Sequence, residues 1–96
     1  MAIQSFADKA TQYLFETGRL KKKVKWSSIK RIVLRKLDML HYADILDDLN
    51  SPPGNQLEKL RGDLKGYYSI RINDQWRIIF TWTPRGPGSV RIIDYH

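Results

Sequence analysis

Two titratable side chains at the end of the sequence, Asp94 and His96, have a spacing that suits proton transfer. In an extended strand, residues two apart project to the same face, so this carboxylate and this imidazole can act together. An imidazole gains and loses protons near neutral pH, as a general acid or base must do. A histidine in this place is also typical of a solvated chain end, and the residue types alone leave both interpretations open.

A run of cations between Gly18 and Leu37 is the second feature with chemical meaning. It contains nine Lys and Arg residues and no acid, in a chain whose formal net charge is +7: Arg19, Lys21, Lys22, Lys23, Lys25, Lys30, Arg31, Arg35 and Lys36. Such a surface suits a polyanionic partner, either nucleic acid or an anionic membrane surface. The simpler alternative is a solvated helix face. Phosphate contacts position a protein on nucleic acid but specify no reaction.

Composition limits the class of protein to which the chain can belong. Ninety-six residues allow one domain with a modest core, and we expect residues 1–96 to form it. The absence of cysteine excludes a disulfide framework and a thiolate metal site, and two distant histidines do not suggest another metal site. No apolar run approaches the ~20 residues of a membrane span. We therefore expect a cytoplasmic domain without metal or cofactor.

The N-terminal half predicts two helices that carry most of the cations. A short strand is predicted over residues 2–6, and a helix over residues 8–16 that Gly18 would end. The second helix follows the basic run, with Ser27 and Ser28 at its cap or in its first turn. Its apolar positions step by three or four and form one buried stripe: Trp26, Ile29, Val33, Leu37 and Leu40.

After the Ser51-Pro52-Pro53-Gly54 break the sequence alternates as strands do. Strands are predicted over residues 57–61, 67–72, 75–82 and 89–95, with a tight turn at residues 73–74 and a loop at residues 84–88. Arg77 alternates with Trp76 and Ile78, so it should project away from the apolar row, and spacing alone favours an exposed strand cation. The expected fold is α+β, two N-terminal helices packed on one face of a small, mainly antiparallel sheet.

Three segments resemble the HigB-like toxins of the RelE/ParE superfamily, also called the plasmid maintenance system killer family. The first combines Ser5-Phe6 with Leu14-Phe15-Glu16-Thr17-Gly18. The second and longest is Leu60-Arg61-Gly62-Asp63-Leu64-Lys65-Gly66-Tyr67-Tyr68-Ser69-Ile70, continued by Gln75-Trp76-Arg77-Ile78. The third is Asp94-Tyr95-His96. The similarity spans almost the whole chain in the family's order, and it implies a RelE-like fold and the toxin of a type II toxin–antitoxin system.

The resemblance also implies an activity and partners. Toxins of this kind are ribosome-dependent, metal-independent endonucleases of messenger RNA that inhibit translation, and the ribose 2′-hydroxyl attacks the neighbouring phosphodiester. The expected partners are a HigA-like helix-turn-helix antitoxin, the ribosome and messenger RNA, with operator DNA bound only indirectly through the antitoxin. The alternative is a non-catalytic module that keeps the toxin fold and binds nucleic acid or another protein.

Four catalytic residues follow from the resemblance: Arg61, Arg77, Asp94 and His96. His96 would act as general acid or base and Asp94 would orient it, while the two guanidinium groups would bind the scissile phosphate. Residues expected to bind RNA are the cations of the basic run and two tyrosines that could stack on a base: Lys22, Lys23, Lys25, Lys30, Arg31, Tyr68 and Tyr95.

Two positions depart from the family pattern. Glu58 stands where many relatives have a histidine, so one possible proton carrier is missing. Arg61 stands in place of a lysine and keeps the charge, but a guanidinium does not deprotonate in proteins. Arg61 is therefore expected to clamp charge rather than to transfer a proton.

Overall fold

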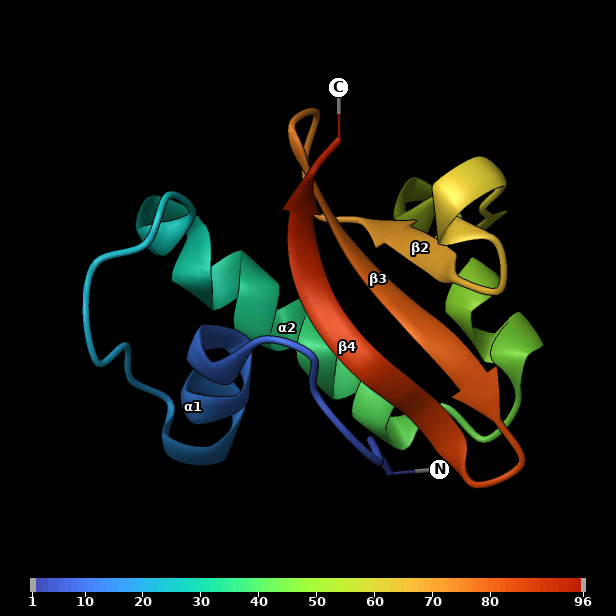
Figure 1. Ribbon diagram of the computed structural model, residues 1–96, viewed down its shortest axis with the longest axis horizontal. Coiled ribbons are helices and arrows are strands. Elements are labelled where there is room, and N and C mark those ends of the chain that lie inside the picture. The colour runs from blue at the N-terminus through green and yellow to red at the C-terminus, as the bar shows by residue number, and fades with distance from the viewer. Residues whose placement is uncertain (1, 96) are drawn as a thin grey trace.

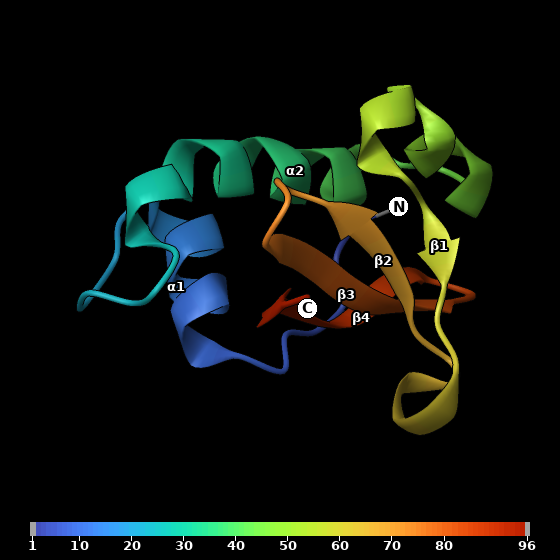
Figure 2. The same ribbon diagram turned by 90° about the horizontal axis from the view of Figure 1, so that it is seen from above.

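The computed structural model describes residues 2–95 and has two helices beside a four-stranded sheet (Figure 1). The helices are α1 (Lys9–Thr17) and α2 (Lys30–Tyr42), and the strands are β1 (Glu58–Lys59), β2 (Tyr68–Arg71), β3 (Trp76–Thr83) and β4 (Gly86–Asp94). The strands pair antiparallel in the order β1-β2-β3-β4. Figure 2 shows α2 lying along one face of this sheet, so the predicted α+β architecture is confirmed.

Local hydrogen bonds explain why α1 begins and ends where it does. The Asp8 carboxylate accepts from the backbone N–H of Ala10 at 2.9 Å and from the Thr11 hydroxyl at 2.7 Å, so it caps the first turn. Gly18 ends the helix with φ +76°, a conformation that costs glycine nothing. The boundaries agree with the predicted helix within one residue.

Of the two places predicted for Ser27 and Ser28, the cap of α2 is wrong, and both serines lie in the turn that leads into the helix. A short 3₁₀ turn, Ser27–Ile29, precedes the helix, and the residue before its first turn is Ile29, which offers no side-chain acceptor. The Ser27 hydroxyl instead binds Val24, accepting from its N–H and donating to its carbonyl, both at 2.7 Å. The apolar stripe is as expected, because Val33, Leu37 and Leu40 are fully buried.

The sheet differs from its prediction mainly at the ends of strands. Only the pairs Glu58–Ser69 and Lys59–Tyr68 join β1 to β2, and the predicted N-terminal strand contributes one parallel bridge, Phe6 to Val90. β4 begins at Gly86 rather than at residue 89, because the Thr83 hydroxyl binds the Gly86 carbonyl at 2.7 Å and closes a tighter turn.

Both faces of β3 are buried, which an alternating pattern did not predict. Trp76, Ile78 and Phe80 face the helices and join the main core, as expected. On the opposite alternation, Ile79 is fully buried and Arg77 keeps only 6% of its surface exposed. The expectation of an exposed strand cation is therefore wrong for Arg77, since residues of β1 and of the segment before it cover this side chain.

Candidate active site

Arg77 is the centre of a small polar cluster on the sheet face that turns away from α2. Its Nη2 donates to the Gln56 carbonyl at 2.5 Å, and its Nη1 lies 3.6 Å from the Glu58 carboxylate. Its Nε is buried without a hydrogen-bond partner among the described residues. A buried guanidinium with unused donor capacity is unusual for a purely structural residue, because leaving a charged donor unpaired costs free energy.

Tyr95 closes this cluster from the end of β4. Its ring centroid lies 5.0 Å from the Arg77 guanidinium, in cation–π range, and its hydroxyl donates to Glu58 Oε1 at 3.2 Å. A backbone bond from Tyr95 N to the Gln75 carbonyl, 2.7 Å, holds the residue beside the β2–β3 turn. Tyr95 is thus held by Arg77, Glu58 and the backbone while 41% of its surface stays exposed.

A cleft of about 560 Å³ opens beside the cluster, and we call it the β1 cleft. Its lining residues come from β1, the turn after it and the end of β4: Glu58, Lys59, Leu60, Arg61, Leu64 and Tyr95. Arg61 also lines a second hollow with Lys65 and Gly62. The 3₁₀ turn Gly62–Leu64 positions Arg61, and Gly62 takes φ +64°, which the turn requires. Lys59 and Arg61 line the β1 cleft and Arg77 lies beside it, while Glu58 is the one carboxylate among the lining residues. This excess of positive charge favours an anionic ligand such as a phosphodiester.

The segment that receives Arg77 is anchored to α2 through a buried amide. The Asn55 side chain donates to the Leu49 carbonyl at 3.2 Å and accepts from Lys36 Nζ at 2.5 Å. Burial lowers the pKa of Lys36 below its usual value, and the charges of Arg35 and Arg71 lower it further. This network fixes the residues around Gln56, whose carbonyl holds the Arg77 guanidinium.

Asp94 lies on the other side of the sheet from Arg77. The register pairs Trp76 with Asp94 and Arg77 with Ile93, and paired residues share a face. The Asp94 carboxylate accepts from Gln75 Nε2 at 3.0 Å and does not line the β1 cleft. His96 lies outside the described residues. The structure therefore brings Arg77 together with Tyr95 and places Arg61 on the same cleft, but not Asp94.

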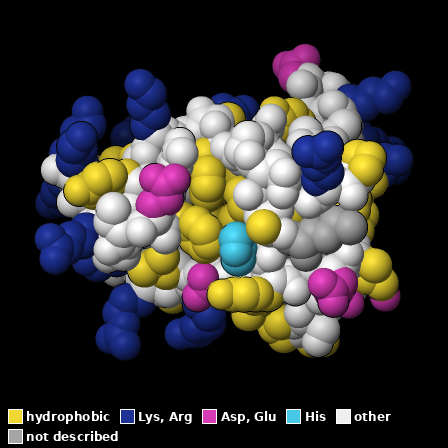
Figure 3. Space-filling view, turned by 90° about the horizontal axis from the view of Figure 1, so that it is seen from below, with side chains coloured by type: hydrophobic (Ala, Val, Ile, Leu, Met, Phe, Trp, Pro, Cys, Tyr) yellow, Lys and Arg dark blue, Asp and Glu magenta, His cyan; other side chains and the backbone are white. Residues whose placement is uncertain are grey.

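Six of the seven residues expected to bind RNA fall into three groups. Lys22, Lys23 and Lys25 are exposed in the connection between α1 and α2, and Figure 3 shows Lys and Arg side chains crowding the end of the molecule that carries α1. Lys30 and Arg31 are exposed in the first turn of α2. Tyr95 lines the β1 cleft.

Tyr68 does not fit its predicted role as a base-stacking residue. Its ring stacks on Phe80 with centroids 6.1 Å apart, and the side chain packs against the main core. Its pairing with Phe80 places it on the helix side of the sheet, away from Arg77. The alternating pattern already placed Tyr68 on the face of Ile70, so packing explains this residue.

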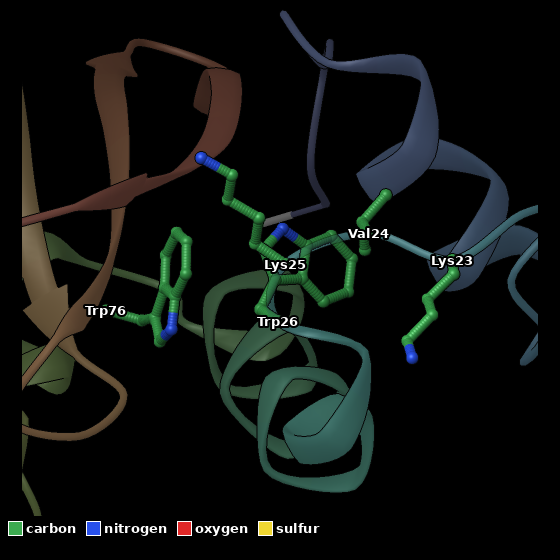
Figure 4. A pocket seen from close by; sticks show the side chains of 5 residues that line it. All are labelled: Lys23, Val24, Lys25, Trp26 and Trp76. Atoms are coloured by element: carbon green, nitrogen blue, oxygen red, sulfur yellow. The ribbon is translucent and has the colours of Figure 1, made fainter.

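Lys23 and Lys25 border an apolar hollow of about 630 Å³, which is also lined by Val24, Trp26 and Trp76. Figure 4 shows the two indole rings on either side of the hollow, with Lys25 reaching across it and Lys23 extending away. Trp26 and Trp76 keep 5% and 8% of their surface exposed, so both serve mainly the core, as their spacing indicated. The ammonium groups remain available to anions.

Glu58 is the site residue that the sequence reasoning missed. In the sequence it is a departure from the family's histidine, whereas in the structure it contacts both Arg77 and Tyr95. The usable signal was its place in a strand just before the Leu60-Arg61-Gly62-Asp63 segment.

Within residues 2–95 no group of three or more histidine, aspartate or glutamate side chains could hold a metal ion. No helix in that range is long and apolar enough to cross a membrane.

The fold has a counterpart among solved structures. The solved YoeB–YefM complex from Staphylococcus aureus matches it with a TM-score of 0.56 at 20% identity, covering 100% of this chain and 97% of the other. At that identity the likeness shows the fold alone, which is the RelE-like α+β fold.

Sequence comparison then identifies the family. Residues 4–96 match the HigB-like toxins, described as the RelE-like toxin of the type II toxin–antitoxin system HigB. Toxin HigB-1 of Vibrio cholerae serotype O1 is 43% identical over 82 residues, which are 85% of this chain and 84% of the relative. Endoribonuclease HigB of Proteus vulgaris is 33% identical over 94 residues, 98% of this chain and 99% of the relative. The chain belongs to the HigB-like toxin family, as the resemblance predicted.

Proposed function

We propose that this toxin is a metal-independent endonuclease that cleaves messenger RNA at the ribosome. The observation that carries the proposal is the buried Arg77, whose guanidinium lies between Glu58 and Tyr95 beside the β1 cleft. Such a preorganised cation stabilises charge that develops in a transition state, and it does so best in a site that excludes water. The name of the Proteus vulgaris relative, an endoribonuclease, supports the same activity.

In the proposed reaction the 2′-hydroxyl attacks the neighbouring phosphorus, and the bond from phosphorus to the 5′ oxygen breaks. Arg61 and Arg77 balance the negative charge that gathers on the phosphoryl oxygens. His96 donates a proton to the departing 5′ oxygen. The products are a 2′,3′-cyclic phosphate and a new 5′-hydroxyl end.

Tyr95 must move for a phosphate to reach Arg77, because its ring covers the guanidinium. Its position beyond the last residue of β4 and its 41% exposure leave room for that movement. Once displaced, the ring can stack on a base of the bound RNA. Tyr95 would then exchange a cation–π contact for a stacking contact of similar strength.

The proposed partners follow from the family and from charge. The exposed cations Lys22, Lys23, Lys25, Lys30 and Arg31 would bind phosphates of ribosomal or messenger RNA. A helix-turn-helix antitoxin of the HigA kind would neutralise the toxin and carry it to operator DNA. The cytoplasm, where ribosomes translate, would be its location.

The alternative, a non-catalytic binding module, needs only the surface cations. It does not account for a charged group buried beside a cleft, since binding to phosphate alone is served by exposed side chains. The two proposals therefore differ in what they predict for Arg77.

Mapping of new 5′-hydroxyl ends in messenger RNA after expression of the toxin tests the activity. We expect codon-phased cleavage that falls at least 100-fold in the folded variants Arg77→Gln and His96→Gln. Arg85→Gln, which changes an exposed arginine in the β3–β4 turn, is the matched control and should cleave normally. RNA binding without any new 5′ ends would support the binding module instead.

A further inference from the structure

Gln56 holds Arg77 through its backbone and not through its side chain. Its carbonyl accepts from Arg77 Nη2 at 2.5 Å, whereas the Glu58 carboxylate lies 3.6 Å from Nη1. The Gln56 side chain is exposed and makes no hydrogen bond with another described residue. A carbonyl oxygen accepts a hydrogen bond without carrying a net charge, so it orients the guanidinium and leaves the positive charge for a phosphate.

The backbone of Gln56 has a conformation that a residue with a side chain rarely adopts. Its φ of +47° and ψ of +54° lie in the left-handed region, where the Cβ atom crowds the following carbonyl oxygen. Gly18 takes a left-handed conformation at the end of α1, and glycine does so without this cost. Non-glycine residues in such conformations persist where the surrounding structure holds them, and they cluster at functional sites. The conformation of Gln56 therefore points to a role for the carbonyl that it directs.

The residues on both sides of Gln56 hold it in this conformation. Asn55 is fully buried, with its amide bonded to the Leu49 carbonyl, and Leu57 packs against the main core. The Gln56 N–H donates to the Pro53 carbonyl at 3.1 Å and closes the 3₁₀ turn before it. From there the chain leads directly into β1 (Figure 2). Because both neighbours are fixed, the dihedral angles of Gln56 decide where its carbonyl points.

We propose that Gln56 is a positioning residue, whose left-handed backbone aims the carbonyl that fixes Arg77 for phosphate binding. This role rests on the proposed endonuclease function. An extended or right-handed backbone at Gln56 would turn the carbonyl away, because ψ sets the direction of the C=O bond. Arg77 would then keep only the more distant Glu58 and would move from the place where negative charge develops on the phosphoryl oxygens.

Two substitutions at this position separate the backbone from the side chain, with single-turnover cleavage of a ribosome-bound messenger RNA as the measurement. Gln56→Val favours an extended backbone, because a β-branched residue is an outlier at positive φ. We expect its maximal rate to fall about 10- to 100-fold, the effect of a displacement of about 1 Å at a reacting centre. The RNA concentration for half the maximal rate should change little, since the exposed cations carry the affinity. Gln56→Gly, which permits the left-handed backbone without any side chain, should recover the rate.

Ser89→Val is the matched control for backbone strain. Ser89 is the other non-glycine residue of the described chain with a positive φ, which is also +47°. Its N–H binds the Ser5 hydroxyl, which takes no part in the cluster around Arg77. We expect Ser89→Val to lower the melting temperature as Gln56→Val does, but to cleave at the wild-type maximal rate. Gln56→Thr, which is β-branched and polar, replaces Gln56→Val if circular dichroism shows the valine variant to be unfolded.

A double variant tests whether Gln56 acts through Arg77. Added to Arg77→Gln, Gln56→Val should lower the maximal rate no further, whereas independent effects would multiply. Multiplied losses would overturn the proposal, as would a wild-type rate in Gln56→Val, a lost rate in Gln56→Gly or an equal loss in Ser89→Val. Absence of cleavage by the wild-type toxin would remove the endonuclease function itself and the positioning role with it, an outcome that appears before any variant is compared.

Discussion

Arg77 places a formal charge where only 6% of the residue's surface meets solvent, and its partners compensate that burial incompletely. The Gln56 carbonyl accepts one hydrogen bond and the Glu58 carboxylate forms an ion pair at 3.6 Å, and both of these residues are exposed. If Arg77 were removed, water could replace its contacts with these exposed partners, so those contacts add little to the free energy of unfolding. The structure therefore keeps Arg77 at a cost that a functional role explains better than a stabilising one.

We expect Arg77→Met to separate activity from stability. A methionine fills much of the same volume without charge, and its partners are left facing water rather than buried, so the free energy of unfolding should fall by no more than about 2 kcal/mol. Cleavage should fall about 10²- to 10³-fold, as when one preorganised donor is removed from a transition state. Urea unfolding and single-turnover cleavage of one preparation measure both effects. An Arg77→Met variant that is unfolded at room temperature, or that cleaves at the wild-type rate, would contradict this account.

The candidate site residues can be named from the sequence more readily than the sheet face on which each one lies. Arg61, Arg77 and Tyr95 could be named from the family pattern, and all three lie at or beside one cleft. Asp94 was expected to work with Arg77, but the register Arg77–Ile93 puts them on opposite faces. A one-residue shift in register exchanges the faces of a strand, so this relation depends on tertiary pairing that a single sequence does not show.

At the scale of elements, the connection between α2 and β1 depends on one buried side chain. Asn55 has no exposed surface, and its amide joins the Leu49 carbonyl to the Lys36 ammonium. Two short 3₁₀ turns, Leu46–Asn50 and Pro53–Asn55, are the regular structure of this region, which has no α-helix or strand. The segment nevertheless delivers the Gln56 carbonyl to Arg77 and leads into Glu58.

We expect Asn55→Ala to lower the free energy of unfolding by about 1–3 kcal/mol, because it leaves a buried carbonyl and an ammonium unsatisfied. Cleavage should fall as well, since the Gln56 carbonyl no longer holds Arg77 in place. Denaturant unfolding measures the first effect and single-turnover cleavage the second. Crystallography or amide exchange of residues 50–58 shows whether the segment has shifted. Asn50→Ala, which removes an exposed amide bonded to Asp47, serves as the control. Equal stability of Asn55→Ala and Asn50→Ala would show that the network is dispensable.

Lys36 gives the same connection a dependence on pH. Its pKa in the folded protein is lowered, so between that pKa and the ordinary value of 10.5 the unfolded chain binds more protons than the folded one. Stability should therefore rise with pH through this window, and it should be lowest, for this group, when the ammonium is fully charged. Lys36→Met should show a smaller rise. The difference between the two unfolding curves against pH isolates Lys36 from the tyrosines, and parallel curves would refute the assignment.

The prediction of elements was most accurate where local physics decides the structure. The Asp8 cap, the Gly18 stop and the stripe through Val33 and Leu37 are local or periodic signals, and α1 and α2 follow them. Ser27 does not cap α2 because its hydroxyl binds back to Val24, and β1 is shorter than expected because just two of its residues pair with β2. The first outcome is a local side-chain contact and the second a pairing between separate segments, and periodicity contains neither.

At the scale of the whole molecule, two separate surfaces carry positive charge. One is the β1 cleft with Arg61 and Lys59, and the other is the α1–α2 connection with Lys22, Lys23 and Lys25. They belong to segments on either side of the sheet end, where Trp76 and Arg77 point to opposite faces. The proposed division of labour is that the cleft performs the chemistry and the connection holds RNA.

That division predicts a change in salt dependence without a change in chemistry. Replacing Lys22, Lys23 and Lys25 together by Gln should remove up to three phosphate contacts, and each contact to single-stranded RNA contributes about 0.7 to the slope of log K against log salt. The slope should therefore flatten by about 2, as measured by the anisotropy of a labelled single-stranded RNA between low and physiological salt. Arg85→Gln should leave the slope as it is. At saturating RNA the triple variant should cleave at the wild-type rate, because Arg77 and Glu58 are untouched. An unchanged slope, or a lost rate at saturation, would show that the connection is not a separate binding surface.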